Sequence, residues 1–358
     1  MILDILNEAP FSKDKIHKST SLTTMLLELT EFHRNNCPEY KNILDGLDYR
    51  SDVVSHYRDL PFLPVSLFKE FELRSIPKED VFKTMTSSGT SGQAVSKIFL
   101  DRETAGNQQK ALVKIVTSFL GGSRLPMLII DSPSVIKDRL NFSARGAGIL
   151  GFMIFGADKT YALNDDMTLN IDGIVNFLDK HAGKKIMLFG FTFMVWQHFY
   201  KELVKSKTQF DLSKGVLIHG GGWKKLVSEA VSSQVFTQAL TDVCGLKEVH
   251  DYYGMVEQTG SIYMECDQGY LHASNFSDII VRRPSDFSEC DFGEVGIVQV
   301  LSPLASSYPG HSLLTEDEGV VIGEDDCRCG RQGKYFKING RLKDAELRGC
   351  SDTYATNF

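Results

Sequence analysis

The residues most suited to chemistry form one short loop rich in hydroxyl groups and glycine. Glycine backbones adopt positive φ and turn N–H groups toward an anion, while serine and threonine hydroxyls donate hydrogen bonds to phosphate oxygens. A lysine five positions after the loop adds positive charge, but no Gly-Lys-Ser/Thr step is present, which disfavours a P-loop. The pattern predicts a phosphate-binding loop of another class, the alternative being a solvated linker. The loop comprises Thr86, Ser87, Ser88, Gly89, Thr90, Ser91 and Gly92, and the lysine is Lys97.

Four later segments give this loop its context. In chain order they are Ile218-His-Gly-Gly-Gly-Trp-Lys, Tyr252-Tyr-Gly-Met-Val-Glu-Gln-Thr-Gly, Leu314-Thr-Glu-Asp and Gly340-Arg-Leu-Lys-Asp. In this order and spacing, the five segments together resemble the core motifs of adenylate-forming enzymes, a superfamily that includes acyl-CoA synthetases, adenylation domains of peptide synthetases and luciferases. Each motif alone is weak. Their shared order along most of the chain carries the resemblance.

The resemblance implies that the chain binds ATP and Mg²⁺. Glu257 matches the glutamate that holds Mg²⁺ between the phosphates, and Tyr253 would stack on the adenine. A carboxylate would attack the α-phosphate of ATP while the metal, Lys97 and backbone donors stabilise the charge, giving an acyl-adenylate. The other nucleotide-binding residues implied by the match are Gly220, Gly221 and Gly222 beside the adenine, Gly254 in the tyrosine motif, and Asp317 and Arg341 at the ribose or phosphates.

Two positions depart from the superfamily pattern. Val256 stands where threonine is usual, and Glu316 replaces the glycine of Thr-Gly-Asp. One phosphate or carboxylate contact is therefore lost, or Thr259 supplies it.

A narrower resemblance comes from three further segments, which are similar to the LuxE branch of acyl-protein synthetases. This branch implies a fatty acid substrate and a protein that accepts the acyl group. Only 14 residues follow Asp344, so the lysine-bearing C-terminal domain of larger members is not expected. Instead Cys350 matches an acylated cysteine, because a thiolate is a strong nucleophile and a thioester remains reactive. The segments begin at Leu63, Phe189 and Glu346.

Alternatives to this interpretation stay open. Cys350 could simply pack, and the adenylate could pass directly to CoA or to a carrier protein. A different class is a non-catalytic adenylate-binding scaffold. The aromatic residues Phe189, Phe191, Phe193 and Trp196 are typical of ordinary core, and as a functional feature they would wall an apolar acyl pocket.

A second set of residues has the composition of a metal site. Cys327-Arg-Cys and the segment that begins at Glu265 resemble parts of phenylacetate-CoA ligase-like proteins. Three thiolates and one imidazole are a usual tetrahedral zinc set, although the local spacings are not those of a standard finger. Reduced cysteines on adjacent turns are the alternative. The four residues of the expected structural zinc site are Cys266, His272, Cys327 and Cys329.

Composition excludes several classes. The 358 residues are 42% hydrophobic and 24% charged, with a net charge of −7, and no basic tract is dense enough for nucleic acid. No signal peptide and no apolar run of about 20 residues is found, so we expect a cytoplasmic protein without a membrane span. Seven cysteines in a reducing compartment make a disulfide framework improbable.

Alternating apolar runs and helical patterns predict an α/β fold with largely parallel sheets. We expect strands at 127–131, 186–191 and 216–219, helices at 103–119, 170–181 and 224–243, and shorter strands at 279–282 and 295–301. The expected domains are a helical cap (1–80), an α/β adenylation core (81–270), a β-rich subdomain (271–340) and a hinge with a short tail carrying Cys350 (341–358).

Overall fold

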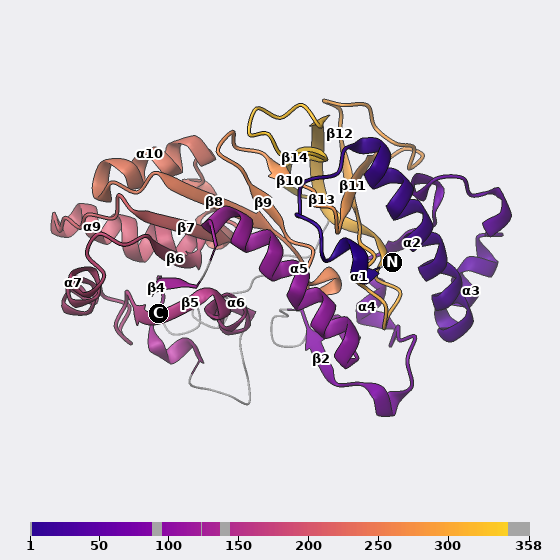
Figure 1. The fold of residues 1–358 in the computed structure, drawn as a ribbon, viewed down its shortest axis with the longest axis horizontal. Helices are drawn as coiled ribbons and strands as arrows, with labels where there is room; N and C mark the ends of the chain where they lie inside the picture. The colour runs from indigo at the N-terminus through magenta and orange to yellow at the C-terminus, as the bar shows by residue number, and fades with distance from the viewer. Residues whose placement is uncertain (1, 88–94, 123, 137–143, 343–358) are drawn as a thin grey trace. The chain divides into compact units, whose positions relative to one another are not determined.

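The computed structural model describes residues 2–87, 95–122, 124–136 and 144–342 (Figure 1). These residues form two compact units, one made of residues 2–116 and 254–342 and the other of 117–253. We call them unit 1 and unit 2. Among the described residues, no helix is both long and apolar enough to cross a membrane.

Unit 2 is a parallel α/β sheet. Its strand order is β8-β7-β6-β4-β5, and every described pair is parallel. Strands β6 and β7 are buried along their whole length, as expected for a parallel sheet covered on both faces. The strands are β4 (Leu125–Ile129), β5 (Gly156–Tyr161), β6 (Ile186–Phe191), β7 (Gly215–Gly220) and β8 (Glu248–Tyr253).

Helices cover this sheet: α6 packs against β6, α7 against β5 and α10 against β8 (Figure 1). Side chains cap two of them, since Asn170 accepts a hydrogen bond from Gly173 N–H and Ser232 accepts one from Val235 N–H. The helices are α6 (Ala144–Phe152), α7 (Ile171–Lys180), α8 (Thr192–Met194), α9 (Lys201–Ser206) and α10 (Ser233–Cys244), with a π-helical turn at Val195–Tyr200 and 3₁₀ turns at Pro133–Ile136, Met153–Phe155 and Lys224–Glu229.

The expectation of one helix over 224–243 is wrong. The chain instead forms the 3₁₀ turn Lys224–Glu229, inside which Leu226 leaves helical geometry, and α10 begins only at Ser233. The Ser232 cap explains the restart, because its hydroxyl satisfies a backbone donor at the first turn of a new helix.

Unit 1 is built on an antiparallel sheet. Its strand order is β11-β12-β13-β14-β10-β9, and β1 pairs in parallel with β13. A separate antiparallel pair, β2–β3, flanks the expected phosphate loop. The strands are β1 (Leu63–Pro64), β2 (Lys83–Thr86), β3 (Lys97–Leu100), β9 (Tyr263–Glu265), β10 (Leu271–His272), β11 (Asp278–Arg282), β12 (Val295–Leu301), β13 (Ser312–Glu324) and β14 (Lys334–Arg341).

The N-terminal helices belong to unit 1. Asp14 caps the long helix α2 by accepting a hydrogen bond from His17 N–H, and α5 runs from unit 1 into unit 2. The helices are α1 (Ile2–Ile5), α2 (Lys15–Asn36), α3 (Pro38–Gly46), α4 (Leu67–Glu70) and α5 (Arg102–Leu120), with 3₁₀ turns at Ser51–Val53, Tyr57–Asp59, Lys78–Asp80 and Val256–Gln258.

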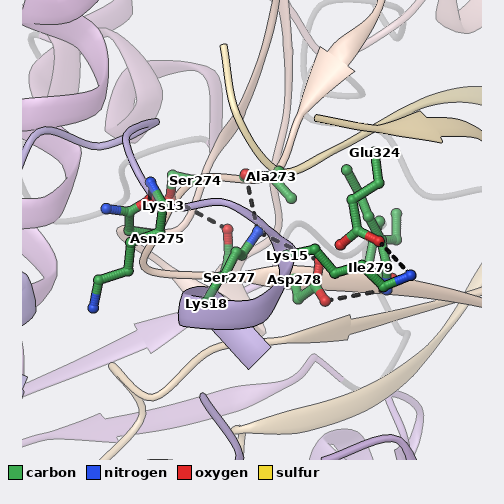
Figure 2. Close-up of polar contacts among 12 residues, drawn as sticks. Lys13, Lys15, Lys18, Ala273, Ser274, Asn275, Ser277, Asp278, Ile279 and Glu324 are labelled. Carbon is green, nitrogen blue, oxygen red and sulfur yellow. Dashed lines mark hydrogen bonds and ion pairs between the residues drawn. The ribbon is translucent and has the colours of Figure 1, made fainter. Parts of the chain in front are cut away.

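A buried charge network ties α2 to this sheet. Figure 2 shows Lys18 between the Ala273 carbonyl and the Asp278 carboxylate, at 3.1 and 3.4 Å. Lys334 Nζ lies 3.1 Å from the other Asp278 oxygen, to which Tyr57 also donates a hydrogen bond. Burial opposes ionisation of Asp278, yet the two ammonium groups hold its pKa below the ordinary value. The network joins four separate elements through one carboxylate.

Taken together, the two units confirm the predicted α/β class with parallel core strands and a β-rich part. The four-part domain division stays a prediction.

Candidate functional site

The β2–β3 hairpin presents the first nucleotide-binding candidates. Thr86 and Lys97 are cross-strand partners, so the lysine stands at the base of the loop. Ser87 donates its N–H to Ser96 O at 3.1 Å, and its hydroxyl accepts from Ser96 N–H at 2.9 Å. Lys97 is half exposed and lies 3.8 Å from the Glu72 carboxylate, a pair too solvated to hold the side chain firmly. The other candidates, Ser88, Gly89, Thr90, Ser91 and Gly92, lie outside the described residues.

The glycine and tyrosine motifs meet at the carboxyl ends of two neighbouring strands of unit 2. Gly220 is the parallel partner of Tyr252, and a Cβ on Gly220 would lie 2.6 Å from the Tyr252 ring. Gly221 and Gly222 have φ of +83° and +67°, which favour glycine. Tyr253 ends β8 and is partly buried. The glycines therefore let the backbone pack directly against the Tyr252 and Phe191 rings.

The same edge of unit 2 carries a buried ion pair that sequence reasoning missed. Asp131 follows β4 and lies 3.2 Å from Arg145 on α6. Burial raises the pKa of Asp131 to about 6, although the guanidinium opposes the shift. Strand β5 lies on one side of β4 and β6 on the other, so this is the switch point of the sheet, where α/β folds commonly bind ligands. Neither residue belongs to a motif that could have identified it.

The aromatic residues of unit 2 divide between core and edge. Trp196 lies in the main hydrophobic core, and Phe189 stacks on Phe152 with ring centroids 4.2 Å apart. Phe191 is buried, whereas Phe193 is partly exposed. Packing explains Trp196 fully.

Glu257 lies in unit 1, in the 3₁₀ turn that follows Gly254. Glu257 is only 3% exposed, and the Tyr308 hydroxyl donates a hydrogen bond to the Glu257 backbone carbonyl at 2.9 Å. Thr259, expected as an alternative contact, donates its hydroxyl to Gln108 Oε1 at 2.5 Å. Sequence patterns did not identify Gln108 and Tyr308, because both residues lie far from Glu257 along the chain.

Asp317 and Arg341 are brought together across β13 and β14. They are cross-strand partners, with Arg341 Nε 3.9 Å from Asp317 Oδ1. Asp317 N–H donates to the Thr315 hydroxyl at 3.1 Å, which fixes the backbone that carries the carboxylate. A carboxylate and a guanidinium therefore stand at one end of the β13–β14 ladder. Cys350 lies outside the described residues.

The four expected zinc ligands converge in unit 1. Their ligand atoms all lie within 4.8 Å of one another, with Cys266 Sγ 4.0 Å from Cys327 Sγ and Cys329 Sγ 3.3 Å from His272 Nε2. Cys266 directly follows β9, His272 is in β10, and both other cysteines lie in the turn between β13 and β14. The β10–β14 pairing places that turn beside His272.

Burial controls the protonation of this cluster. It raises the pKa of the Cys266 thiol to about 12 and lowers the pKa of His272 to about 4, the latter with help from the positive charge of Arg331. A bound cation would reverse this effect on the thiols, since a coordinating thiol is deprotonated. The ligand set thus has the chemistry of a closed, structural metal site.

Comparison with known proteins places the chain in a family. A family model described as "Acyl-protein synthetase, LuxE" matches residues 2–358. The chain is similar to two proteins named long-chain-fatty-acid–luciferin-component ligase. One, from Aliivibrio fischeri, is 24% identical over 345 residues, covering 91% of this chain and 86% of the relative. The other, from Vibrio harveyi, is 20% identical over 355 residues, covering 96% and 90%.

A solved structure shares the fold. An open conformation of 2-hydroxyisobutyryl-CoA ligase, in complex with 2-HIB-AMP and CoA, matches with a TM-score of 0.70 at 14% identity, covering 94% of this chain and 77% of the ligase. At this identity the match shows a shared fold alone.

Proposed function

Because the chain belongs to the LuxE family of acyl-protein synthetases, we propose that it activates a fatty acid with ATP and transfers the acyl group to a protein thiol. The observation that carries this proposal is the family match along residues 2–358. The buried Glu257 and the paired Asp317 and Arg341 support it, because they supply groups suited to a metal–nucleotide complex. The reaction uses ATP and a free thiol, which suits the cytoplasm.

In the first step, a carboxylate oxygen of the acid attacks the α-phosphorus of ATP, the bond to the leaving phosphate breaks and pyrophosphate departs. Asp317 accepts hydrogen bonds from the ribose, and Arg341 contacts the same ribose or the phosphates. Tyr253 stacks on the adenine beside the backbone of Gly220, Gly221 and Gly222. Lys97 and the backbone of the hydroxyl-rich loop offset charge on the phosphates.

Glu257 is the residue that would hold Mg²⁺. It fits, since carboxylate oxygens are preferred magnesium ligands and Glu257 is buried in a turn fixed by hydrogen bonds. When bound, the ion neutralises phosphate charge as pyrophosphate leaves.

In the second step, a thiolate attacks the acyl carbonyl carbon, the bond to AMP breaks and a thioester forms. We assign this thiol to Cys350, from which the acyl group passes to an acceptor protein.

The Cys/His cluster would hold a structural zinc ion. Zinc bonds of about 2.0–2.3 Å in a tetrahedron set ligand atoms about 3.3–3.8 Å apart. The observed spread of up to 4.8 Å needs only a small contraction. Zinc would then fix the β13–β14 turn against β10.

The test compares the wild type with Cys350→Ser in two assays. We expect the variant to keep fatty-acid-dependent ATP–pyrophosphate exchange but to lose hydroxylamine-sensitive acylation, because a serine hydroxyl is not appreciably ionised at neutral pH. Cys290→Ser, a buried cysteine outside the expected sites, is the matched control and should keep both activities.

Other outcomes identify the alternatives. Retention of acylation in Cys350→Ser would remove Cys350 from the reaction, and acid-dependent CoA thioester formation would favour direct transfer. ATP binding by wild-type protein with neither activity would indicate a scaffold.

A further inference from the structure

The turn that carries Glu257 is held by side chains from two other parts of unit 1. Tyr308 Oη donates to Glu257 O at 2.9 Å, and Gln108 Nε2 donates to Tyr308 Oη at 3.4 Å. Gln108 Oε1 in turn accepts from the Thr259 hydroxyl at 2.5 Å. A continuous hydrogen-bond chain therefore starts at Glu257, passes through α5 and returns to the same turn at Thr259.

This chain is shielded from water. Gln108 is 4% exposed, Glu257 is 3% exposed and Tyr308 is fully buried. A buried amide or hydroxyl that loses its partner costs about 1–3 kcal/mol, so the Gln108 and Tyr308 side chains hold each other and the peptide group of Glu257 in place.

Two further contacts hold the turn that carries Glu257, one from its backbone and one from a side chain. Gly260 has a φ of +87°, and a Cβ there would lie 2.6 Å from Gln108 O. On the other side, Gln258 Nε2 donates to Gly310 O at 3.0 Å. The turn therefore contacts both α5 and the segment that precedes β13.

We propose that Gln108 and Tyr308 are positioning residues that aim the Glu257 carboxylate at the metal–nucleotide complex. The inference rests on the proposed function, in which Glu257 holds Mg²⁺. Tyr308 holds the peptide group of Glu257 and leaves the carboxylate to the ion, while Gln108 orients Tyr308. Such outer partners commonly change metal affinity or activity about 10–100-fold when mutated.

The central variant is Tyr308→Phe, which removes one oxygen and keeps the ring in contact with Phe68. Tyr263→Phe is the matched control. Tyr263 is also buried in unit 1, and its hydroxyl also donates to a backbone carbonyl, that of Asp278 at 3.1 Å, away from the Glu257 turn. Both variants lose a hydroxyl bond to a backbone carbonyl, and in Tyr308→Phe the Gln108 amide keeps the Leu304 carbonyl as an acceptor at 3.4 Å. A purely structural role therefore predicts similar results for both.

The first readout is independent of activity. Mn²⁺ serves as a spectroscopic probe for the Mg²⁺ position, and its binding is titrated by electron paramagnetic resonance with a non-reacting ATP analogue present. We expect Tyr308→Phe to weaken Mn²⁺ binding about 10-fold, in the range for outer partners, and Tyr263→Phe to leave it within about 2-fold. Thr259→Val, which breaks the chain at its other end, should weaken binding in the same direction.

The second readout is ATP–pyrophosphate exchange as a function of Mg²⁺ concentration. Half-saturation should shift upward in Tyr308→Phe and not in Tyr263→Phe. Gln108→Leu combined with Tyr308→Phe should cost less than the sum of the single effects, because both act on one chain.

The outcomes separate the two hypotheses. If Glu257→Ala abolishes Mn²⁺ binding and exchange while Tyr308→Phe behaves like Tyr263→Phe, the positioning role is overturned and the proposed function stands. If Glu257→Ala keeps normal Mn²⁺ binding and exchange, the metal role of Glu257 fails and the positioning role falls with it.

Discussion

The Cys/His cluster and the nucleotide-binding candidates differ in how the chain supplies them. All four cluster residues come from unit 1, on the β9–β10 hairpin and the β13–β14 turn, which strand pairing brings together. The nucleotide candidates are spread over many elements, with Gly220, Gly221, Gly222 and Tyr253 in unit 2 and the other described candidates in unit 1. Strand pairing within unit 1 is therefore enough to assemble the cluster, whereas each nucleotide candidate is positioned by the unit to which it belongs.

The first prediction would break the cluster and has the largest expected effect. Elemental analysis should find about one zinc per chain, and Cys327→Ser or a strong chelator should greatly lower the melting temperature, because structural zinc binding is worth on the order of 10 kcal/mol. Cys290→Ser should keep the metal. Metal-free wild-type protein that melts normally would show that the cysteines are ordinary.

The second prediction concerns the charge network beside the cluster. Asp278→Ala should destabilise the protein by about 3–5 kcal/mol, because it leaves two buried ammonium groups without their counter-charge. Urea unfolding measures the loss. Asp291→Ala, at a side chain that is 94% exposed, should change stability by less than about 0.5 kcal/mol. Equal effects of the two substitutions would show that the charge network does not stabilise the fold.

The third prediction addresses the nucleotide candidates. Glu257→Ala should lower the rate of pyrophosphate exchange about 10²–10³-fold, as is typical for loss of one preorganised electrostatic group. Glu257→Gln keeps the packing and removes the charge, so it should lose activity to a similar extent while keeping its melting temperature. Near-normal exchange in both variants would contradict the assignment.

The fourth prediction uses pH to probe the interior of unit 1. His33 and His311 are stacked at 5.0 Å and buried. Burial lowers both pKa values, that of His311 to about 3, and the charge of His311 further lowers that of His33. Below about pH 6.5 the two histidines bind protons in the unfolded chain but stay neutral in the folded chain, so the free energy of unfolding falls as pH falls.

The expected slope is at most about 1.4 kcal/mol per pH unit for each histidine. Urea unfolding between pH 7 and pH 5 measures it. His311→Gln should flatten the slope, because it removes one of the two buried imidazoles. An unchanged slope in His311→Gln would contradict the prediction.

Elements with strong apolar patterns could be predicted from the sequence. The strands expected at 186–191 and 295–301 have those bounds in the structure, because each is a predominantly apolar run flanked by polar residues. The helix expected at 224–243 was wrong at its start, since a single serine cap outweighs the continuous pattern. The family resemblance was also available from motif order, and the family match confirms it.

Contacts between distant residues could not be predicted in this way, because they depend on how strands and helices pack. The types of Cys266, His272, Cys327 and Cys329 suggested zinc, but the β10–β14 pairing is what brings their ligand atoms within 4.8 Å. Gln108 carried no signal, because its partner Tyr308 lies 200 positions away. Lys18 and Asp278, 260 positions apart, are another such pair. Local patterns report propensity and burial, whereas long-range hydrogen bonds and ion pairs form only when strands and helices pack, so no spacing in the sequence records them.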